Sequence, residues 1–211
     1  AILDDAERHI LDISQDRDRR GLTKVYHIID ESLDRLETLS QNKSDITGVA
    51  SGFIDLDKIT AGWQPSDLII IAASPAMGKT AFSLNIANYA SVAKDVPTAI
   101  FSLEMSKEQL VQRMMSTNAR IDQHALRTGN LYGDQWDALI RANGPLASAP
   151  LYIDDPPSIS IRELRAKSRR LQAEEKDLGL IIIDYLQLMT GGSAESLQQE
   201  VPTISRNLKG L

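Results

Sequence analysis

The sequence contains no cysteine and only three histidines among its 211 residues. Without cysteine, neither a disulfide framework nor a thiolate metal site can form. His9, His27 and His124 lie too far apart in the sequence for the ligand spacing of a zinc site. These absences fit the cytosol, and we expect a cytoplasmic location.

Long apolar runs are also missing. No stretch approaches the roughly 18 uninterrupted apolar residues that a membrane span requires. The first residues, AILDDAERHI, lack the basic start and hydrophobic stretch of a signal peptide. With 42% hydrophobic and 25% charged residues, the composition is ordinary for a globular protein. We therefore expect a soluble chain with a buried core and no membrane partner.

Basic residues are fewer than acidic ones, 23 against 29, and the net charge is -6. This balance argues mildly against a protein whose whole surface binds nucleic acid. A ring that threads a strand needs only local basic loops, so the charge leaves nucleic-acid binding open. The chain begins without Met and stops at NLKGL, within a helical pattern. We interpret it as a fragment.

An amphipathic helix is predicted from Thr23 to Leu39. Its apolar residues recur every three to four positions. They are Leu22, Val25, Ile29, Leu33, Leu36 and Leu39. Such a helix must cover its apolar face. The pattern alone leaves open whether its own domain or a neighbouring subunit provides the cover. The polar link SQNKSDITGVASG then marks a boundary near Gly48.

After this link, short apolar runs alternate with helical segments. The runs at 68–72, 98–103 and 180–183 predict strands that are buried on both faces, with a fourth candidate at 152–153. Helical periodicity marks 79–93, 107–118, 134–142 and 161–174. Capping boxes open at Ser106 and Ser160. The fold class predicted is α/β, with a mostly parallel sheet flanked by helices.

The segment ASPAMGKT follows the first predicted strand and opens a predicted helix. A turn in this position aims backbone N–H groups at phosphate oxygens. The candidate phosphate-binding residues are Ala73, Ser74, Pro75, Ala76, Met77, Gly78, Lys79, Thr80 and Ala81. Lys79 is expected to reach the β and γ phosphates, and the Thr80 hydroxyl to ligate Mg²⁺. Ala73 replaces the first glycine and Pro75 removes a donor, so a purely structural helix start is the alternative.

Two carboxylates close other predicted strands. Asp184 ends LGLIIID and could hold a metal-bound water opposite the phosphate-binding turn. Glu104 ends TAIFSLE and could polarise a water for attack on the γ phosphate. The alternatives are a solvated Asp at a strand end and a favourable charge near a helix N-terminus.

Two further features bear on nucleic acid. Arg162, Arg165 and Arg169 share a helix face. The face could contact phosphates, but the nearby acidic residues favour a solvated charged surface. The loop TGGSAESLQQ is the better candidate for DNA contact, because its glycines and small polar residues suit a mobile loop. Contacts would come from Gly191, Gly192 and Ser193, through backbone amides and a hydroxyl.

These motifs together, in this order, resemble the RecA-like motor domain of replicative DnaB-type helicases. The resemblance runs from about Thr47 to Leu211 through TGVASGFIDLDKITAGWQPSDLIIIAASPAMGKT, FSLEMSKEQLVQRM and LIIIDYLQLM. It implies a RecA-like P-loop NTPase core that uses ATP and Mg²⁺. It also implies that Glu104 is the catalytic base, and that Lys79, Thr80 and Asp184 occupy the family's phosphate and Mg²⁺ positions.

The resemblance also implies a domain organisation. Residues 1–20 end an amino-terminal helical domain, 21–46 form a linker helix and link, and 47–211 form a RecA-like ATPase domain that is incomplete at its C-terminus. In the family the linker helix docks on the adjacent subunit of a homo-hexameric ring. The expected partners are single-stranded DNA, primase and a helicase loader. The chain stops before the family's arginine finger, so weak hydrolysis is expected of residues 1–211 alone.

We therefore predict an ATP-dependent replicative helicase that translocates on single-stranded DNA and unwinds the duplex at the fork. One alternative is a RecA-type or clock-type ATPase on the same core, which would form filaments or double rings. The other is a non-catalytic assembly module that binds a loader or primase through the predicted helix from Thr23 to Leu39. Nucleotide binding separates this module from the two ATPases.

Overall fold

The computed structural model describes residues 24–41, 45–74, 76–175 and 177–185. The chain divides into two compact units, residues 1–44 and 45–211. Among the helices of the described residues, none is both long enough and apolar enough to cross a membrane.

The described part of the first unit is one helix, α2 (Val25–Gln41). This confirms the predicted helix. Its apolar stripe is largely exposed, with Val25, Ile29, Leu33 and Leu36 between 50% and 67% accessible. Within the described residues of its own unit, the stripe therefore has no cover.

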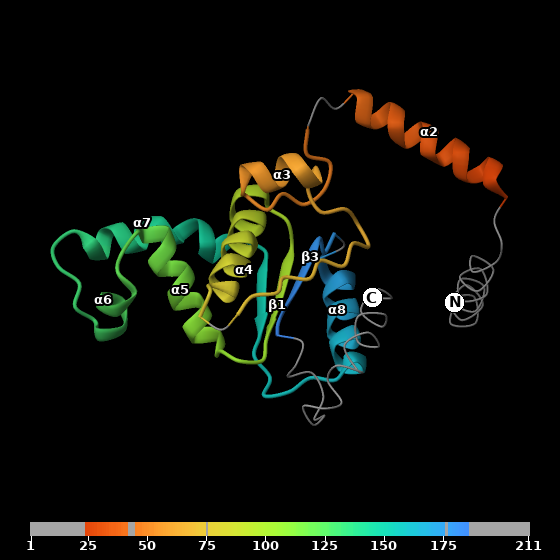
Figure 1. Ribbon diagram of the computed structural model, residues 1–211. Coiled ribbons are helices and arrows are strands. Elements are labelled where there is room, and N and C mark those ends of the chain that lie inside the picture. Colours follow the sequence, from red (N-terminus) through yellow and green to blue (C-terminus); the bar gives the residue numbers. More distant parts are fainter. Residues whose placement is uncertain (1–23, 42–44, 75, 176, 186–211) are drawn as a thin grey trace, which may run out of the picture. The chain divides into compact units, whose positions relative to one another are not determined.

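The second unit is built on a parallel sheet of three strands. They are β1 (Thr98–Ser102), β2 (Leu151–Asp154) and β3 (Leu180–Asp184). The strand order is β2-β1-β3, which puts β1 in the centre (Figure 1). All five residues of β1 are buried, as expected for a strand with a neighbour on both edges. The predicted parallel sheet is confirmed for these three strands.

Helices lie against the sheet and supply its two hydrophobic clusters. On one side Ile100 of β1 packs with residues of α4 (Lys79–Asn88) and α5 (Lys107–Ala119). In the other cluster, Phe101 and its neighbours pack with residues of α8 (Ile161–Glu175). Successive residues of a strand point to opposite faces, so the central strand serves both clusters.

The remaining helices are short or peripheral to the sheet (Figure 1). A π-helical turn, η1 (Tyr89–Ala93), continues α4 and completes the helix predicted over 79–93. The helix α7 (Gln135–Ser148) extends further than predicted and contains Pro145. Two helices were not predicted, α3 (Ile54–Thr60) and α6 (Gln123–Thr128). Both are shorter than two full turns, too short for a clear periodic pattern.

The α3 segment is fastened by one buried carboxylate. Asp57 accepts hydrogen bonds from the Ser51 backbone N–H at 2.8 Å, the Ser51 hydroxyl at 2.7 Å and the Gly52 N–H at 3.1 Å. Phe53, next along the chain, stacks on Phe82 of α4 with the ring centroids 4.7 Å apart. These contacts fix the residues before α3 against the helix that follows the candidate phosphate-binding turn.

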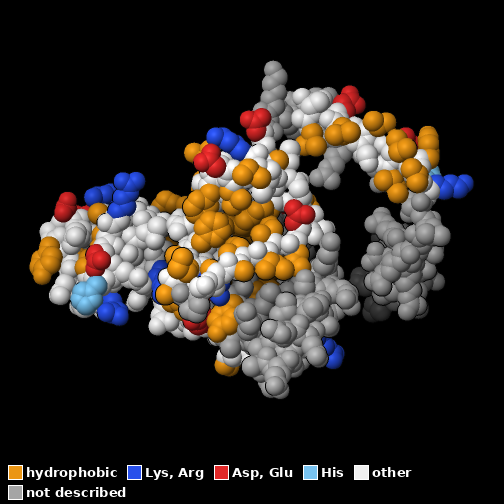
Figure 2. Space-filling model, in the orientation of Figure 1, with side chains coloured by type: hydrophobic (Ala, Val, Ile, Leu, Met, Phe, Trp, Pro, Cys, Tyr) orange, Lys and Arg blue, Asp and Glu red, His pale blue; other side chains and the backbone are white. Residues whose placement is uncertain are grey.

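The predicted strand at 68–72 is wrong. The structure has no strand there, and Leu68, Ile69, Ile70 and Ile71 are 36% to 60% accessible where burial on both faces was expected. A strand is held by hydrogen bonds to a neighbouring chain. Among the described residues none pairs with this segment. Figure 2 shows apolar side chains gathered on the surface around α3 and α4.

Candidate functional site

The turn that leads into α4 has the backbone expected of an anion-binding turn. The Met77 N–H donates to the Ser74 carbonyl at 3.3 Å, and α4 begins at Lys79. Gly78 caps the helix with φ 85° and ψ 19°, in the left-handed region. A Cβ at Gly78 would meet no atom within 4 Å, so glycine is favoured there by the backbone angle.

Of the two departures from a glycine-rich turn, the structure describes the one at Ala73. Ala73 is not among the described residues with positive φ, so an alanine fits there without left-handed strain. Ala76 does have a positive φ, 63°, and it is the position in the turn where a side chain is strained. Pro75 lies outside the described residues.

The N-terminus of α4 has no side-chain cap. Among the described residues, no side chain accepts a hydrogen bond from the backbone at Gly78. The first N–H groups of a helix have no partner within the helix, and they carry the positive end of its dipole. A phosphate group is a suitable acceptor for such N–H groups.

Asp184 joins the turn to the sheet. Its Oδ2 accepts a hydrogen bond from the Thr80 hydroxyl at 2.7 Å, and its Oδ1 lies 3.1 Å from the Lys79 Nζ. The Asp184 side chain is 8% accessible and that of Lys79 is 27% accessible. The structure therefore brings together three of the predicted site residues, although 104 positions separate Thr80 from Asp184.

The oxygen atoms at this point suit a small hard cation. Mg²⁺ prefers oxygen ligands and usually retains several waters, so one or two protein ligands are enough. Thr80 supplies a hydroxyl and Asp184 a carboxylate, with their oxygens 2.7 Å apart. The described residues hold no group of three or more His, Cys, Asp or Glu side chains that could form an all-protein metal cage.

Glu104 lies at the same edge of the sheet. In the β1–β3 register Ser102 is opposite Asp184, and the Leu103 N–H donates to the Asp184 carbonyl at 2.7 Å. Glu104 is the next residue and is exposed. The Ser102 hydroxyl donates to the Met105 carbonyl at 2.7 Å and accepts from its N–H at 3.2 Å. This turn fixes the backbone on both sides of Glu104.

Asp155, just beyond β2, is a site neighbour that sequence reasoning missed. It accepts a hydrogen bond from the Lys107 backbone N–H at 3.0 Å, and the Lys107 Nζ lies 3.3 Å away. The Lys107 N–H, assisted by the ammonium, holds the pKa of Asp155 below its ordinary value. Asp155 thus ties the start of α5 to the end of β2. The available signal was the pair of carboxylates that follows LYI.

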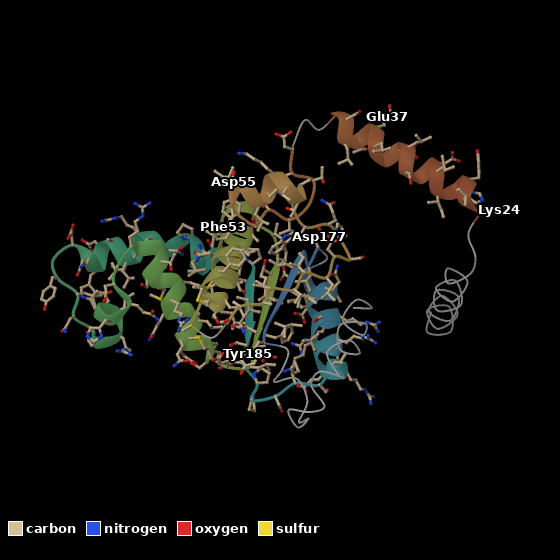
Figure 3. The ribbon with its side chains drawn as sticks, in the orientation of Figure 1. Lys24, Glu37, Phe53, Asp55, Asp177 and Tyr185 are labelled. Carbon is tan, nitrogen blue, oxygen red and sulfur yellow. The ribbon has the colours of Figure 1, made fainter. Side chains whose placement is uncertain are left out.

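Tyr185 was also missed. The Lys79 Nζ lies 4.1 Å from the centre of its ring, within the range of a cation–π contact. Figure 3 shows Tyr185 at the end of the sheet. An aromatic residue directly after the acidic residue of the strand was the only signal in the sequence.

The nucleic-acid candidates stay predictions. Arg162 and Arg169 are exposed on α8, whose buried residues are Leu164 and Ser168. Lys167, on the same helix, pairs with Asp154 at 2.8 Å and Glu163 at 3.2 Å, which is typical of a solvated charged surface. Gly191, Gly192 and Ser193 lie outside the described residues.

Known proteins are similar to the whole chain. The "Replicative DNA helicase DnaC" of Bacillus subtilis is 46% identical over 212 residues, and the "Replicative DNA helicase DnaB" of Geobacillus stearothermophilus is 47% identical. Each alignment covers 100% of this chain and 46% of the relative. The chain thus spans less than half the length of these relatives.

Solved structures have the same fold. One of them, described as an ATPase domain, superposes with a TM-score of 0.76 and 34% identity, over 86% of this chain and 66% of that one. "The Structure Of A DnaB-Like Replicative Helicase And Its Interactions With Primase" gives a TM-score of 0.72 and 34% identity, over 86% and 44%. These neighbours confirm the predicted RecA-like α/β fold class.

The family match covers most of the second unit, including every described residue of the site. The "DnaB-like helicase C terminal domain" family matches residues 48–211. With this match and the relatives above, the chain belongs to the family of DnaB-like helicase C-terminal domains.

Proposed function

We propose that this chain is the motor part of an ATP-dependent replicative DNA helicase, which translocates on single-stranded DNA and unwinds the duplex at the fork. The observation that carries the proposal is the single carboxylate of Asp184, which contacts both Lys79 and Thr80 at the start of α4. Ligands of parallel α/β sheets bind beyond the carboxyl ends of the strands. The residues of the proposed site lie at that edge.

In this proposal residues 73–81 bind the triphosphate. Their backbone N–H groups, with those at the N-terminus of α4, donate to the phosphate oxygens. Lys79 turns one or more of its ammonium hydrogens from Asp184 to the β and γ phosphates. Positive charge there stabilises the charge that spreads over the γ-phosphoryl oxygens in the transition state.

Thr80 and Asp184 are the residues that would hold Mg²⁺. When bound, the ion neutralises phosphate charge and orients the β and γ oxygens for in-line displacement. The Thr80 hydroxyl, which now donates to Asp184 at 2.7 Å, would turn a lone pair to the ion.

Glu104 is proposed as the general base. It is exposed at the end of β1, where its carboxylate can accept a proton from a water that attacks the γ phosphorus. The bond from the γ phosphorus to the bridging oxygen breaks, and ADP and inorganic phosphate leave. The Ser102–Met105 hydrogen bonds keep this turn in a fixed conformation, which is what a positioned base requires.

We further propose that the protein forms a homo-hexameric ring through α2. Among the described residues of its own unit, nothing covers the apolar stripe of this helix, and an amphipathic helix is stable only when that face is buried. A neighbouring copy can provide the cover. Residues 1–20 are proposed as the end of an amino-terminal helical domain, 21–46 as the linker and 47–211 as the ATPase domain.

The proposed partners are single-stranded DNA, primase and a helicase loader, and the proposed location is the cytoplasm. One structural neighbour is a DnaB-like replicative helicase whose structure concerns its interactions with primase, which supports the proposal of primase as a partner. Gly191, Gly192 and Ser193 are proposed to contact DNA.

The test is Lys79→Ala in the full-length protein, with Lys58→Ala as the matched control. Lys58 is an exposed lysine of α3 that pairs only with Asp55 among the described residues. Lys79→Ala is expected to abolish both ATP hydrolysis, measured as phosphate release, and unwinding of a forked duplex. Lys58→Ala should retain both activities.

Three results would contradict the proposal in different ways. Normal ATP hydrolysis by the Lys79→Ala protein would contradict the assignment of Lys79 to the ATP site. Hydrolysis without unwinding, together with filaments in the wild-type protein, would favour the RecA-type alternative. No binding of ATP with Mg²⁺ to the wild-type protein would favour the assembly module.

A further inference from the structure

We propose that Tyr185 is a positioning residue for Lys79. Its ring holds the ammonium at the mouth of the phosphate-binding turn, before and after the nucleotide enters. This inference rests on the proposed function, because it gives Lys79 the role of binding phosphate. Tyr185 belongs neither to the phosphate-binding turn nor to the proposed Mg²⁺ ligands, so the inference adds a residue to the proposed site.

The geometry places the ammonium between a carboxylate and a ring. The Lys79 Nζ is 3.1 Å from the Asp184 Oδ1 and 4.1 Å from the centre of the Tyr185 ring. The Lys79 side chain is 27% accessible, so the contact is partly shielded from water. Shielding strengthens a cation–π contact relative to one on an open surface.

The two neighbours of Lys79 act differently when a nucleotide binds. Asp184 would hold Mg²⁺, and the ion would then compete with the ammonium for its carboxylate. The ring of Tyr185 has no net charge and no metal to bind. It can therefore stay against the ammonium while the ammonium hydrogens donate to phosphate oxygens.

A held lysine binds phosphate better than a free one. The lysine side chain is long and flexible, and fixing it costs conformational entropy. If the ring limits the positions of the side chain in the empty site, less of this entropy remains to be lost on binding. Tyr185 is therefore expected to act on nucleotide affinity more than on the chemical step.

The ring, and not the hydroxyl, carries this role. Among the described residues, the Tyr185 hydroxyl makes no hydrogen bond, whereas the ring lies against the Lys79 ammonium. Tyr185→Phe keeps the ring and removes the hydroxyl, whereas Tyr185→Leu keeps apolar bulk and removes the ring. Comparing the two variants separates the aromatic face from simple filling of space.

The experiment measures equilibrium binding of a fluorescent ATP analogue with Mg²⁺ to the full-length protein, without turnover. Tyr185→Leu should raise Kd by about two- to fivefold, the fold-change expected of one partly exposed cation–π contact. Tyr185→Phe should stay within about twofold of the wild type. Tm is measured for each variant. If Tyr185→Leu lowers Tm, the binding measurement is repeated with Tyr185→Met, which also lacks the ring.

A double-mutant cycle with Lys79→Met decides whether Tyr185 acts through the lysine. In that background Tyr185→Leu should leave Kd unchanged, because the contact is already lost. An equal rise of Kd in both backgrounds would overturn the inference, since Tyr185 would then act by another route. No rise in the wild-type background would also overturn it.

The same measurements separate this inference from the proposed function. If Lys79→Met binds the nucleotide as tightly as the wild type, the phosphate role of Lys79 fails, and the role of Tyr185 fails with it. If Lys79→Met weakens binding and Tyr185→Leu does not, only the inference on Tyr185 fails.

Discussion

The Thr80 hydroxyl donates a 2.7 Å hydrogen bond to Asp184, and these two residues are 104 positions apart in the sequence. Thr80 is in the first turn of α4, and Asp184 is the last residue of β3. The contact therefore joins α4, the helix that follows the turn in the sequence, to the edge of the sheet. The same carboxylate also pairs with Lys79, so Asp184 is the common partner of Lys79 and Thr80.

Asp184→Asn should reduce ATP hydrolysis by about 100-fold or more, the usual effect of losing one electrostatic contact in an active site. The amide can still accept the hydrogen bond from Thr80, but it no longer carries charge for Mg²⁺ or Lys79. Phosphate release under saturating ATP measures the effect in the full-length protein.

Asp177→Asn is the matched control for this substitution. Asp177 is an exposed aspartate in the loop that leads into β3 (Figure 3), and it belongs to no part of the proposed site. Its substitution should leave hydrolysis within about twofold of the wild type, as surface changes usually do. An Asp184→Asn protein that hydrolyses ATP equally well would contradict the metal assignment.

A second prediction concerns Asp57, which is 4% accessible and accepts three hydrogen bonds from Ser51 and Gly52. Asp57→Asn replaces one acceptor oxygen with an NH₂ donor that faces other donors. A buried polar group that loses its partner costs about 1–3 kcal/mol. Hydrogen exchange of the Ser51 and Gly52 amides should then accelerate by about 5- to 150-fold.

Asp55→Asn provides the comparison on the same short helix. The Asp55 side chain is 94% accessible and pairs with Lys58 at 3.3 Å, a surface pair of small energetic value. Exchange of the same two amides should change by less than about threefold. Equal acceleration in both variants would show that the buried hydrogen bonds do not stabilise this segment.

The parts of the site that could be predicted are those in which local pattern and topology agree. The runs predicted as strands at 98–103 and 180–183 form β1 (Thr98–Ser102) and β3 (Leu180–Asp184), and the two strands are parallel. Parallel neighbours end at the same edge, so a carboxylate at that edge could be expected close to a turn that binds there. The ion pair of Asp184 with Lys79 and the order of the strands became known only from the structure.

Other features depend on contacts that no local pattern contains. The run 68–72 has the composition of a buried strand, but a strand also requires a hydrogen-bonded neighbour, and none of the described residues supplies one. The Tyr185 ring contacts Lys79 through the orientation of two side chains. The three hydrogen bonds to Asp57 depend on the path of the backbone between Ser51 and Asp57, which no periodic pattern predicts.

The lowered pKa of Asp155 predicts a change of stability with pH. The carboxylate is favoured in the folded protein by the Lys107 backbone N–H and ammonium. Because the folded pKa is below the unfolded one, the contribution is fully present above the ordinary value of about 3.8. It is lost as the pH falls from there through the lowered folded pKa.

Asp155→Asn isolates this contribution. The amide oxygen can still accept from the Lys107 N–H, so the charge alone is removed. The wild type should unfold at a higher urea concentration than Asp155→Asn at about pH 7. This difference should shrink as the pH is lowered below about 3.8. A difference that stays constant over the same range would show that the charge of Asp155 contributes nothing.

Assembly through α2 should depend on the exposed apolar stripe of that helix. Leu33 is 58% accessible within the stripe. If a neighbouring copy covers it, Leu33→Asp loses the burial of a leucine and puts a charge in an apolar contact. The lost free energy of burying the leucine side chain is about 1.5–3 kcal/mol, which raises the Kd of each interface by at least about tenfold.

Thr38→Asp is the matched control for Leu33→Asp, because the helical spacing puts residue 38 on the face opposite the stripe. Light scattering on the eluting full-length protein should show a hexamer for the wild type and Thr38→Asp, and smaller species for Leu33→Asp. If Leu33→Asp elutes as an intact hexamer, the stripe does not hold the ring together, and α2 must bury its apolar face within its own subunit.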